Sequence, residues 1–149
     1  MAPRVLISDK LSETAVQIFR DRGLDVTFEP DLGKDKDRLL EMIPDFDGLA
    51  IRSATKVSDK VLEAATNLRV IGRAGIGVDN VDTKAASARG VIVMNTPYGN
   101  SITTAEHAIS MMMAVARQIP EANASTHAGK WEKSRFMGVE LTSKTLGVI

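Results

Sequence analysis

Short apolar runs alternate with stretches of helical periodicity through the first hundred residues, and this alternation strongly limits the possible fold. Five runs are as short as strands, at residues 5–7, 24–28, 48–51, 68–71 and 91–94, and the first of them is mostly β-branched. Parallel neighbouring strands require crossover connections, which the intervening helical stretches can supply. The pattern therefore predicts an α/β fold with a doubly wound parallel sheet.

Residues that favour helix ends stand at the boundaries of the predicted helices. Ser12, Ser58 and Asp82 stand where N-caps are expected, and Gly23 suits the end of the first helix. From Ser101 a long helix is predicted through Ile119, with Pro120 ending or bending it and a second helix reaching about residue 127.

The last residues, 144–149, form another strand-like apolar run. Because an unpaired apolar strand is a poor end for a domain, we expect this chain to be a truncated or cleaved form of a longer protein.

Composition narrows the classes of function. The 149 residues are 44% hydrophobic and 26% charged, and 19 basic residues balance 19 acidic ones, so neither nucleic acid nor a membrane surface is an expected partner. The absence of cysteine excludes disulfides and thiol chemistry, and two isolated histidines predict no metal site. No segment is typical of a signal peptide or membrane span, so we expect a cytoplasmic protein.

The segment VIGRAGIGVDNVD, residues 70–82, is the richest in functional signals. Gly72, Gly75 and Gly77 follow a predicted strand, and bare backbone in such a loop allows close approach to an anion. Arg73 adds a guanidinium that can bind a carboxylate or phosphate through two hydrogen bonds. A tight turn in which Asp79 caps or pairs with Arg73 is the alternative explanation.

This loop departs from a dinucleotide-binding fingerprint. Gly75 and Gly77 supply the first two glycines, but Asn80 stands at the third position, and no acidic residue follows the next strand at Met94 and Asn95. The dinucleotide fingerprint is therefore disfavoured, and an anion site and a tight turn both stay open for this loop.

Two other segments also follow predicted strands. Arg52 and Ser53 come directly after residues 48–51, and Asn100 lies where the long helix begins. Arg52 can share an anion with the glycine loop, and Asn100 can face a ligand at a helix N-terminus. Taken alone, Arg52 also fits an ordinary surface residue and Asn100 a helix cap.

The later helices contain candidates for a subunit contact. Met112 lies in a run of three methionines, which fits core packing as well as an adaptable subunit contact. Trp131 is flanked by basic residues that include Arg135. Such an aromatic residue is either an interface anchor or a cover for the local core.

Several motifs in series, IRSATKVS, VIGRAGIGVDNVD, VMNTPYGNS, ARQIP, GKWEKSRFMG and KTLGVI, resemble the D-2-hydroxyacid dehydrogenase family, in particular its phosphoglycerate dehydrogenase branch. The resemblance implies an NAD-dependent enzyme of serine biosynthesis that oxidises 3-phosphoglycerate at C2. It implies a flavodoxin-like substrate-binding domain at residues 1–98. Residues 99–149 would be the start of a Rossmann nucleotide-binding domain, with dimerisation-arm helices and a first strand.

The resemblance also suggests roles for individual residues. Substrate contacts are expected from Arg52, Ser53, Arg73, Gly75, Gly77 and Asn100. Cofactor contacts are expected from Ile76 and Asn100, and contacts in a homodimer or homotetramer, formed through residues 99–138, from Met112, Trp131 and Arg135. The catalytic His, Glu and Arg and the main NAD loop are expected beyond Ile149, so the isolated chain should be inactive. The alternatives are another 2-hydroxyacid specificity and a non-catalytic anion-binding module.

Overall fold

The computed structural model describes residues 2–149, which divide between Asn100 and Ser101 into two compact units. The division lies close to the boundary expected after residue 98, and the roles assigned to the two parts stay predictions.

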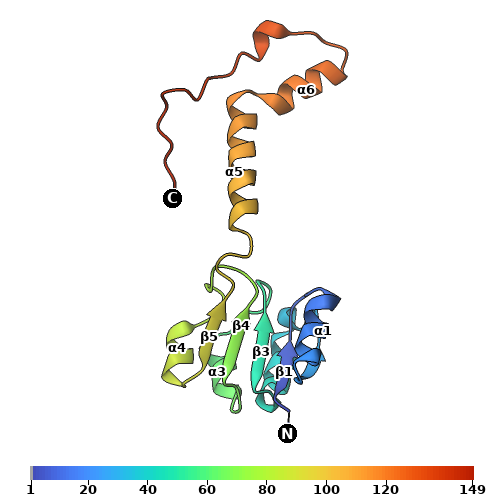
Figure 1. Ribbon diagram of the computed structural model, residues 1–149, viewed down its shortest axis with the longest axis vertical. Coiled ribbons are helices and arrows are strands. Elements are labelled where there is room, and N and C mark those ends of the chain that lie inside the picture. The colour runs from blue at the N-terminus through green and yellow to red at the C-terminus, as the bar shows by residue number, and fades with distance from the viewer. Residues whose placement is uncertain (1) are drawn as a thin grey trace. The chain divides into compact units, whose positions relative to one another are not determined.

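The first unit is built on a five-stranded parallel sheet with the order β2-β1-β3-β4-β5. Figure 1 shows β1, β3, β4 and β5 of this sheet side by side. Its strands are β1 (Arg4–Ile7), β2 (Asp25–Phe28), β3 (Gly48–Ile51), β4 (Val70–Arg73) and β5 (Ile92–Asn95). This order is the flavodoxin-like doubly wound topology, which confirms the predicted fold class. The strand order reverses between β1 and β3, and ligands bind doubly wound sheets at such a reversal.

Helices cover both faces of this sheet, because successive strand residues point to opposite sides. Val5, Ile7 and Ala50 pack with Val16 of α1 (Glu13–Asp21) in one core cluster. Leu6, Leu49 and Ile71 belong to a larger cluster on the other face, and α2, α3 and α4 contribute to it. These helices and the short 3-10 turns span α2 (Lys36–Met42), α3 (Asp59–Ala64), α4 (Thr83–Ala88), η1 (Leu32–Lys34) and η2 (Ile43–Asp45).

Two of the three predicted N-caps form as expected. Ser12 accepts a hydrogen bond from the Ala15 N–H, and Asp82 accepts one from the Ala85 N–H. Ser58 stands at the N-cap position of α3, but its side chain makes no capping hydrogen bond. Gly23 ends the first helical segment with φ +78°, a backbone conformation that glycine adopts without steric cost.

The second unit contains α5 (Ser101–Ala116), α6 (Ile119–His127) and η3 (Lys133–Arg135). The long helix was predicted to run through Ile119, but it ends at Ala116 because Gln118 takes a left-handed conformation with φ 51°. Pro120 instead lies in the first turn of α6, where its missing N–H costs nothing. None of the helices among residues 2–149 is long and apolar enough to cross a membrane.

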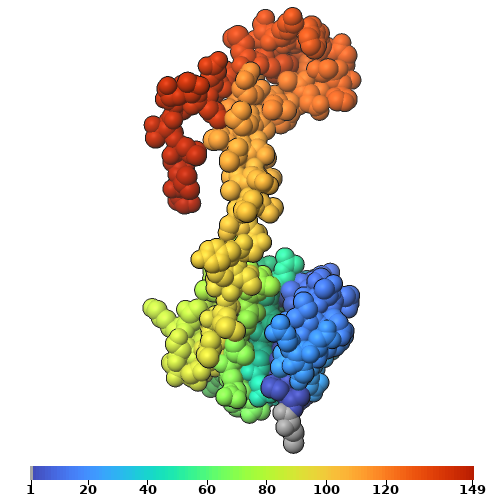
Figure 2. All heavy atoms as spheres, viewed as in Figure 1, coloured from blue at the N-terminus to red at the C-terminus, as the bar shows by residue number. Residues whose placement is uncertain are grey.

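Residues 144–149 do not form the predicted strand. A strand exists only when its backbone groups pair with a neighbouring strand, and the described part of the chain offers this run no such neighbour. No residue of the second unit, residues 101–149, is fully buried. Figure 2 draws the atoms of this unit as the orange to red spheres. The second unit therefore has no core of its own, unlike the first.

Candidate functional site

The candidate site lies at the carboxyl edge of the sheet, where the loops after β3, β4 and β5 are joined by hydrogen bonds. Ile51, Arg73 and Asn95 are in register on the three adjacent strands. The Ala74 N–H donates to Ile51 O at 2.8 Å, and the Thr96 N–H donates to Gly75 O at 3.0 Å. The three segments found in the sequence are therefore neighbours in space.

The segment 52–55, here called the Arg52 loop, is tied to the buried residue Asp9 after β1. Asp9 is 2% exposed, and its Oδ2 accepts the Arg52 N–H at 2.6 Å and the Thr55 N–H at 3.2 Å. The Thr55 hydroxyl donates to Asp9 Oδ1 at 3.0 Å and shares a further hydrogen bond with Ser8 Oγ at 2.7 Å. Gly33 packs so closely here that a Cβ would collide with the Thr55 hydroxyl.

The same loop is tied on another side to Asn80, which follows the glycine loop. The Asn80 side-chain N–H₂ group donates to Arg52 O and to Thr55 O, each at 2.7 Å. The Val57 N–H also donates to Asn80 O at 2.8 Å. Asn80 thus links the glycine loop to the Arg52 loop.

The glycine loop, residues 74–77, is shaped by Arg73. The Arg73 guanidinium lies against Gly75, where a Cβ would collide with it. The Gly75 N–H donates to Arg73 O at 3.0 Å, so this amide is already occupied. The Ile76 and Gly77 N–H groups meet no acceptor within residues 2–149, and both residues are exposed. These amides can therefore donate to a bound anion.

The two arginines share the edge, but their guanidinium groups rest against different segments. Arg52 Nη1 donates to Lys10 O at 3.4 Å, toward the β1 side, whereas Arg73 folds over its own loop. Arg73 Nε is buried and has no hydrogen-bond partner in the described part of the chain. The edge thus holds two positive groups and free amides.

The remaining predicted site residues are exposed. Ser53 follows Arg52, Asn100 ends the first unit, and Ile76 is 43% exposed. The alternative explanation of the glycine loop, a tight turn in which Asp79 caps or pairs with Arg73, agrees with the structure in part. A turn does form, with the Val81 N–H donating to Val78 O at 2.9 Å, but Asp79 makes no ion pair with Arg73 within residues 2–149.

A large hollow of the first unit lies elsewhere. A cavity of about 1050 Å³ runs along the sheet face beside α1, from Arg4 at the amino edge to Arg73 and Thr96 at the carboxyl edge. It includes neither Arg52 nor Gly77, so charge and free backbone amides, rather than volume, define the candidate site. Residues 2–149 contain no cluster of three or more His, Asp or Glu side chains able to hold a metal.

Asp9 and Asn80 were not identified from the sequence. Asp9 follows the apolar run 5–7, and a polar residue directly after the first strand of a doubly wound sheet was an available signal. Asn80 was noted only because it replaces the third glycine of a nucleotide fingerprint. Neither residue's partners are near in sequence, which is why spacing alone did not reveal their roles.

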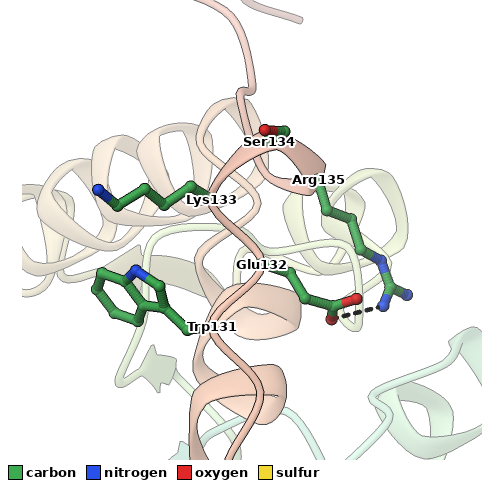
Figure 3. Close-up of a pocket in the computed structure, with 5 residues that line it drawn as sticks. All are labelled: Trp131, Glu132, Lys133, Ser134 and Arg135. Carbon is green, nitrogen blue, oxygen red and sulfur yellow. Dashed lines mark hydrogen bonds and ion pairs between the residues drawn. The ribbon is translucent and has the colours of Figure 1, made fainter.

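The residues predicted for a subunit contact lie in the second unit. Trp131 is 76% exposed beside a shallow hollow of about 510 Å³, and Lys133 Nζ lies 5.9 Å from its ring centroid (Figure 3). Glu132 bonds Arg135 at 3.0 Å and accepts a hydrogen bond from the Ser125 hydroxyl at 2.8 Å. The Ser125 bond, with Arg135 adding to it, lowers the pKa of Glu132 against the opposing effect of desolvation.

Met112 is half-buried, whereas several of its apolar neighbours on α5 are exposed: Ile102, Ile109, Met111, Met113 and Val115. A helix with this much exposed apolar surface is typical of a contact with another surface. The role of Met112, Trp131 and Arg135 in an interface stays a prediction.

Comparison with known proteins gives one consistent result. The family model described as D-isomer specific 2-hydroxyacid dehydrogenase, catalytic domain, matches residues 5–145. D-3-phosphoglycerate dehydrogenases from Archaeoglobus fulgidus and Homo sapiens are 49% and 51% identical over 146 residues. Each alignment covers 98% of this chain and 27% of the relative, so the chain spans about a quarter of the length of these curated relatives.

A solved structure points the same way. The NAD+-bound 3-phosphoglycerate dehydrogenase of Entamoeba histolytica aligns with a TM-score of 0.69 and 31% identity. The alignment covers 78% of this chain and 40% of that one.

Proposed function

This chain belongs to the D-isomer specific 2-hydroxyacid dehydrogenase family, and we propose that it forms the substrate-binding part of an enzyme that oxidises 3-phosphoglycerate at C2 with NAD. Relatives about 50% identical carry that activity in their names, which supports this substrate over other 2-hydroxy acids. The proposal includes a place in serine biosynthesis and a cytoplasmic location.

The observation that carries the proposal is the cationic edge of the sheet. Arg52 and Arg73 follow or end adjacent parallel strands, and the free amides of Ile76 and Gly77 lie in the loop between β4 and α4. A carboxylate and a phosphate on one small molecule need more than one positive group, and guanidinium and amide donors suit both. The role proposed for Arg52, Ser53, Arg73, Gly75, Gly77 and Asn100 is to bind and orient this substrate.

The residues present do not form a nucleotide phosphate loop. Asn80 occupies the position of the third glycine, its side chain is committed to two carbonyl oxygens, and β5 ends at Asn95 without an acidic residue. We propose that NAD, the hydride acceptor, is held mainly by other parts of the protein, with Ile76 and Asn100 at its edge. The catalytic His, Glu and Arg are likewise placed outside this chain.

We also propose that the second unit serves assembly. The exposed apolar residues of α5, together with Trp131, supply surface for a homodimer or homotetramer through residues 99–138.

An assay of the complete gene product tests the proposed activity. NADH formation is measured with 3-phosphoglycerate, with D-glycerate and D-lactate, and with NADP in place of NAD. We expect NAD reduction that depends on 3-phosphoglycerate, and none from the isolated 149-residue chain. Preference for an unphosphorylated acid would favour another specificity within the family. Binding of 3-phosphoglycerate without any redox activity of the complete product would favour an anion-binding module.

A further inference from the structure

Two side chains fix the backbone of the Arg52 loop, one through its N–H groups and the other through its carbonyl groups. We propose that both are positioning residues of the substrate site. They are Asp9, which binds the N–H groups of Arg52 and Thr55, and Asn80, which binds the carbonyl groups of the same two residues. This inference rests on the proposed function, because it assigns a purpose to the fixed position of Arg52.

Asp9 is held in place by hydrogen bonds to its buried carboxylate. Its carboxylate is buried, and a buried carboxylate requires donors that compensate for lost hydration. Two backbone N–H groups and the Thr55 hydroxyl supply them at 2.6 to 3.2 Å. Asp9 also packs closely against Gly33 of η1, where an added Cβ would lie 2.6 Å from Asp9 Oδ1.

The Asn80 contacts fix the orientation of its amide. Its nitrogen has two hydrogens, and each is donated to a carbonyl oxygen at 2.7 Å. Exchanging the oxygen and nitrogen would place three acceptors together, so this orientation follows from the hydrogen bonds themselves. The Asn80 Oδ1 atom is buried without a hydrogen-bond partner in the described part of the chain. The Asn80 side chain is therefore held through its N–H₂ group.

The consequence is a loop whose two ends are fixed while its middle is open. All four backbone polar groups of Arg52 and Thr55 are bound, whereas Ser53 and Ala54 between them are exposed. The Arg52 guanidinium therefore extends from a fixed Cα. Asn80 also lies only three residues beyond Gly77, so it sets the distance between the two segments proposed to bind the substrate. Geometry held in advance lowers the cost of ordering these groups on binding.

The ordinary alternative is that Asn80 merely stabilises the fold. Asn67 provides a matched control, because its side-chain amide also donates to a backbone carbonyl, that of Pro44, at 2.7 Å. Asn67 precedes β4 and so lies at the amino edge of the sheet, away from the candidate site. A purely structural role predicts similar behaviour of Asn80→Ala and Asn67→Ala.

The test compares these two variants in the complete gene product by KM for 3-phosphoglycerate, KM for NAD, kcat and melting temperature. We expect Asn80→Ala to raise the KM for 3-phosphoglycerate about tenfold or more, since small errors of position are costly in a preorganised site. The KM for NAD should stay near the wild-type value, and Asn67→Ala should change neither KM. Equal KM values for 3-phosphoglycerate in Asn80→Ala and wild type would overturn the inference.

The test of Asp9 uses Asp9→Asn, because Asp9→Ala would leave the N–H groups of Arg52 and of the buried Thr55 without their acceptor and endanger folding. Asparagine keeps an acceptor oxygen for both N–H groups. The KM for 3-phosphoglycerate should therefore stay within about threefold of wild type, well below the rise expected when Arg52 is misplaced. A KM as high as that of Asn80→Ala would contradict backbone positioning by Asp9. A wild-type protein that neither binds nor oxidises 3-phosphoglycerate would refute the proposed function, and with it any positioning role.

Discussion

The Arg73 guanidinium lies against the backbone of Gly75, so closely that a methyl group on Gly75 would collide with it. The missing side chain of Gly75 thus leaves room for the guanidinium of Arg73, which ends β4.

We predict that Gly75→Ala displaces Arg73 and raises the KM for 3-phosphoglycerate as Arg73→Ala does. Because both changes act through one guanidinium, the double variant should be little worse than either single variant. Gly72→Ala is the control, since a Cβ there meets nothing within 4 Å. Steady-state kinetics of the four variants provide the check, and strictly additive losses would separate Gly75 from Arg73.

Arg52→Ala should weaken substrate binding more than it slows turnover. Loss of a charge-assisted hydrogen bond costs about 1.5 to 3 kcal/mol, which corresponds to roughly 10- to 150-fold in KM for 3-phosphoglycerate. Arg89→Ala is a matched control, because Arg89 precedes β5 at the amino edge and pairs with Asp59 at 2.8 Å. A normal KM in Arg52→Ala would remove Arg52 from the site.

The first unit could be predicted closely because its signals are local. Each strand is a short apolar run, and Ser12 and Asp82 bond N–H groups three residues away. The carboxyl-edge position of Arg52 and Arg73 followed from strand direction alone. The direction of each guanidinium did not, because it depends on Lys10 and Gly75 contacts that no periodicity encodes.

The sequence did not predict features whose interaction partners are distant along the chain or missing from the described residues. Residues 144–149 have the composition of a strand but no neighbour to pair with among the described residues. The Asp9 contacts span 43 to 46 residues of sequence, and those of Asn80 span 25 to 28. Only the strand order brings these groups together.

Acid should loosen the segment around Trp131. The pKa of Glu132 is lowered from its ordinary value of 4.5, first by the Ser125 hydroxyl and then by Arg135. The ionised form is therefore favoured in the folded chain, so its contribution is complete above pH 4.5 and is lost as the pH falls through the lower folded value.

Fluorescence of Trp131, the only tryptophan of the 149-residue chain, provides the measurement. We expect a transition with a midpoint below pH 4.5 that Ser125→Ala moves upward toward 4.5. Ser110→Ala removes a hydroxyl that bonds only the Glu106 carbonyl, so it should leave the midpoint unchanged. An unshifted midpoint in Ser125→Ala would disprove the proposed cause.

Ile109→Lys should dissociate the oligomer of the complete gene product. Ile109 is 57% exposed on α5, so a charge there disturbs no core but would be desolvated in an interface. Ile18→Lys is the control, because Ile18 on α1 is similarly exposed at 52%. Light scattering should show a smaller assembly only for Ile109→Lys. An unchanged mass for that variant would place the interface elsewhere.

Hydrogen–deuterium exchange of the complete gene product, with and without 3-phosphoglycerate, locates the bound substrate directly. Binding at the carboxyl edge predicts slower exchange in peptides that contain residues 52–55 and 74–80. Protection that is absent there, or confined to the amino-edge end of the cavity near Arg4 and Arg69, would contradict substrate binding by the Arg52 loop and the glycine loop.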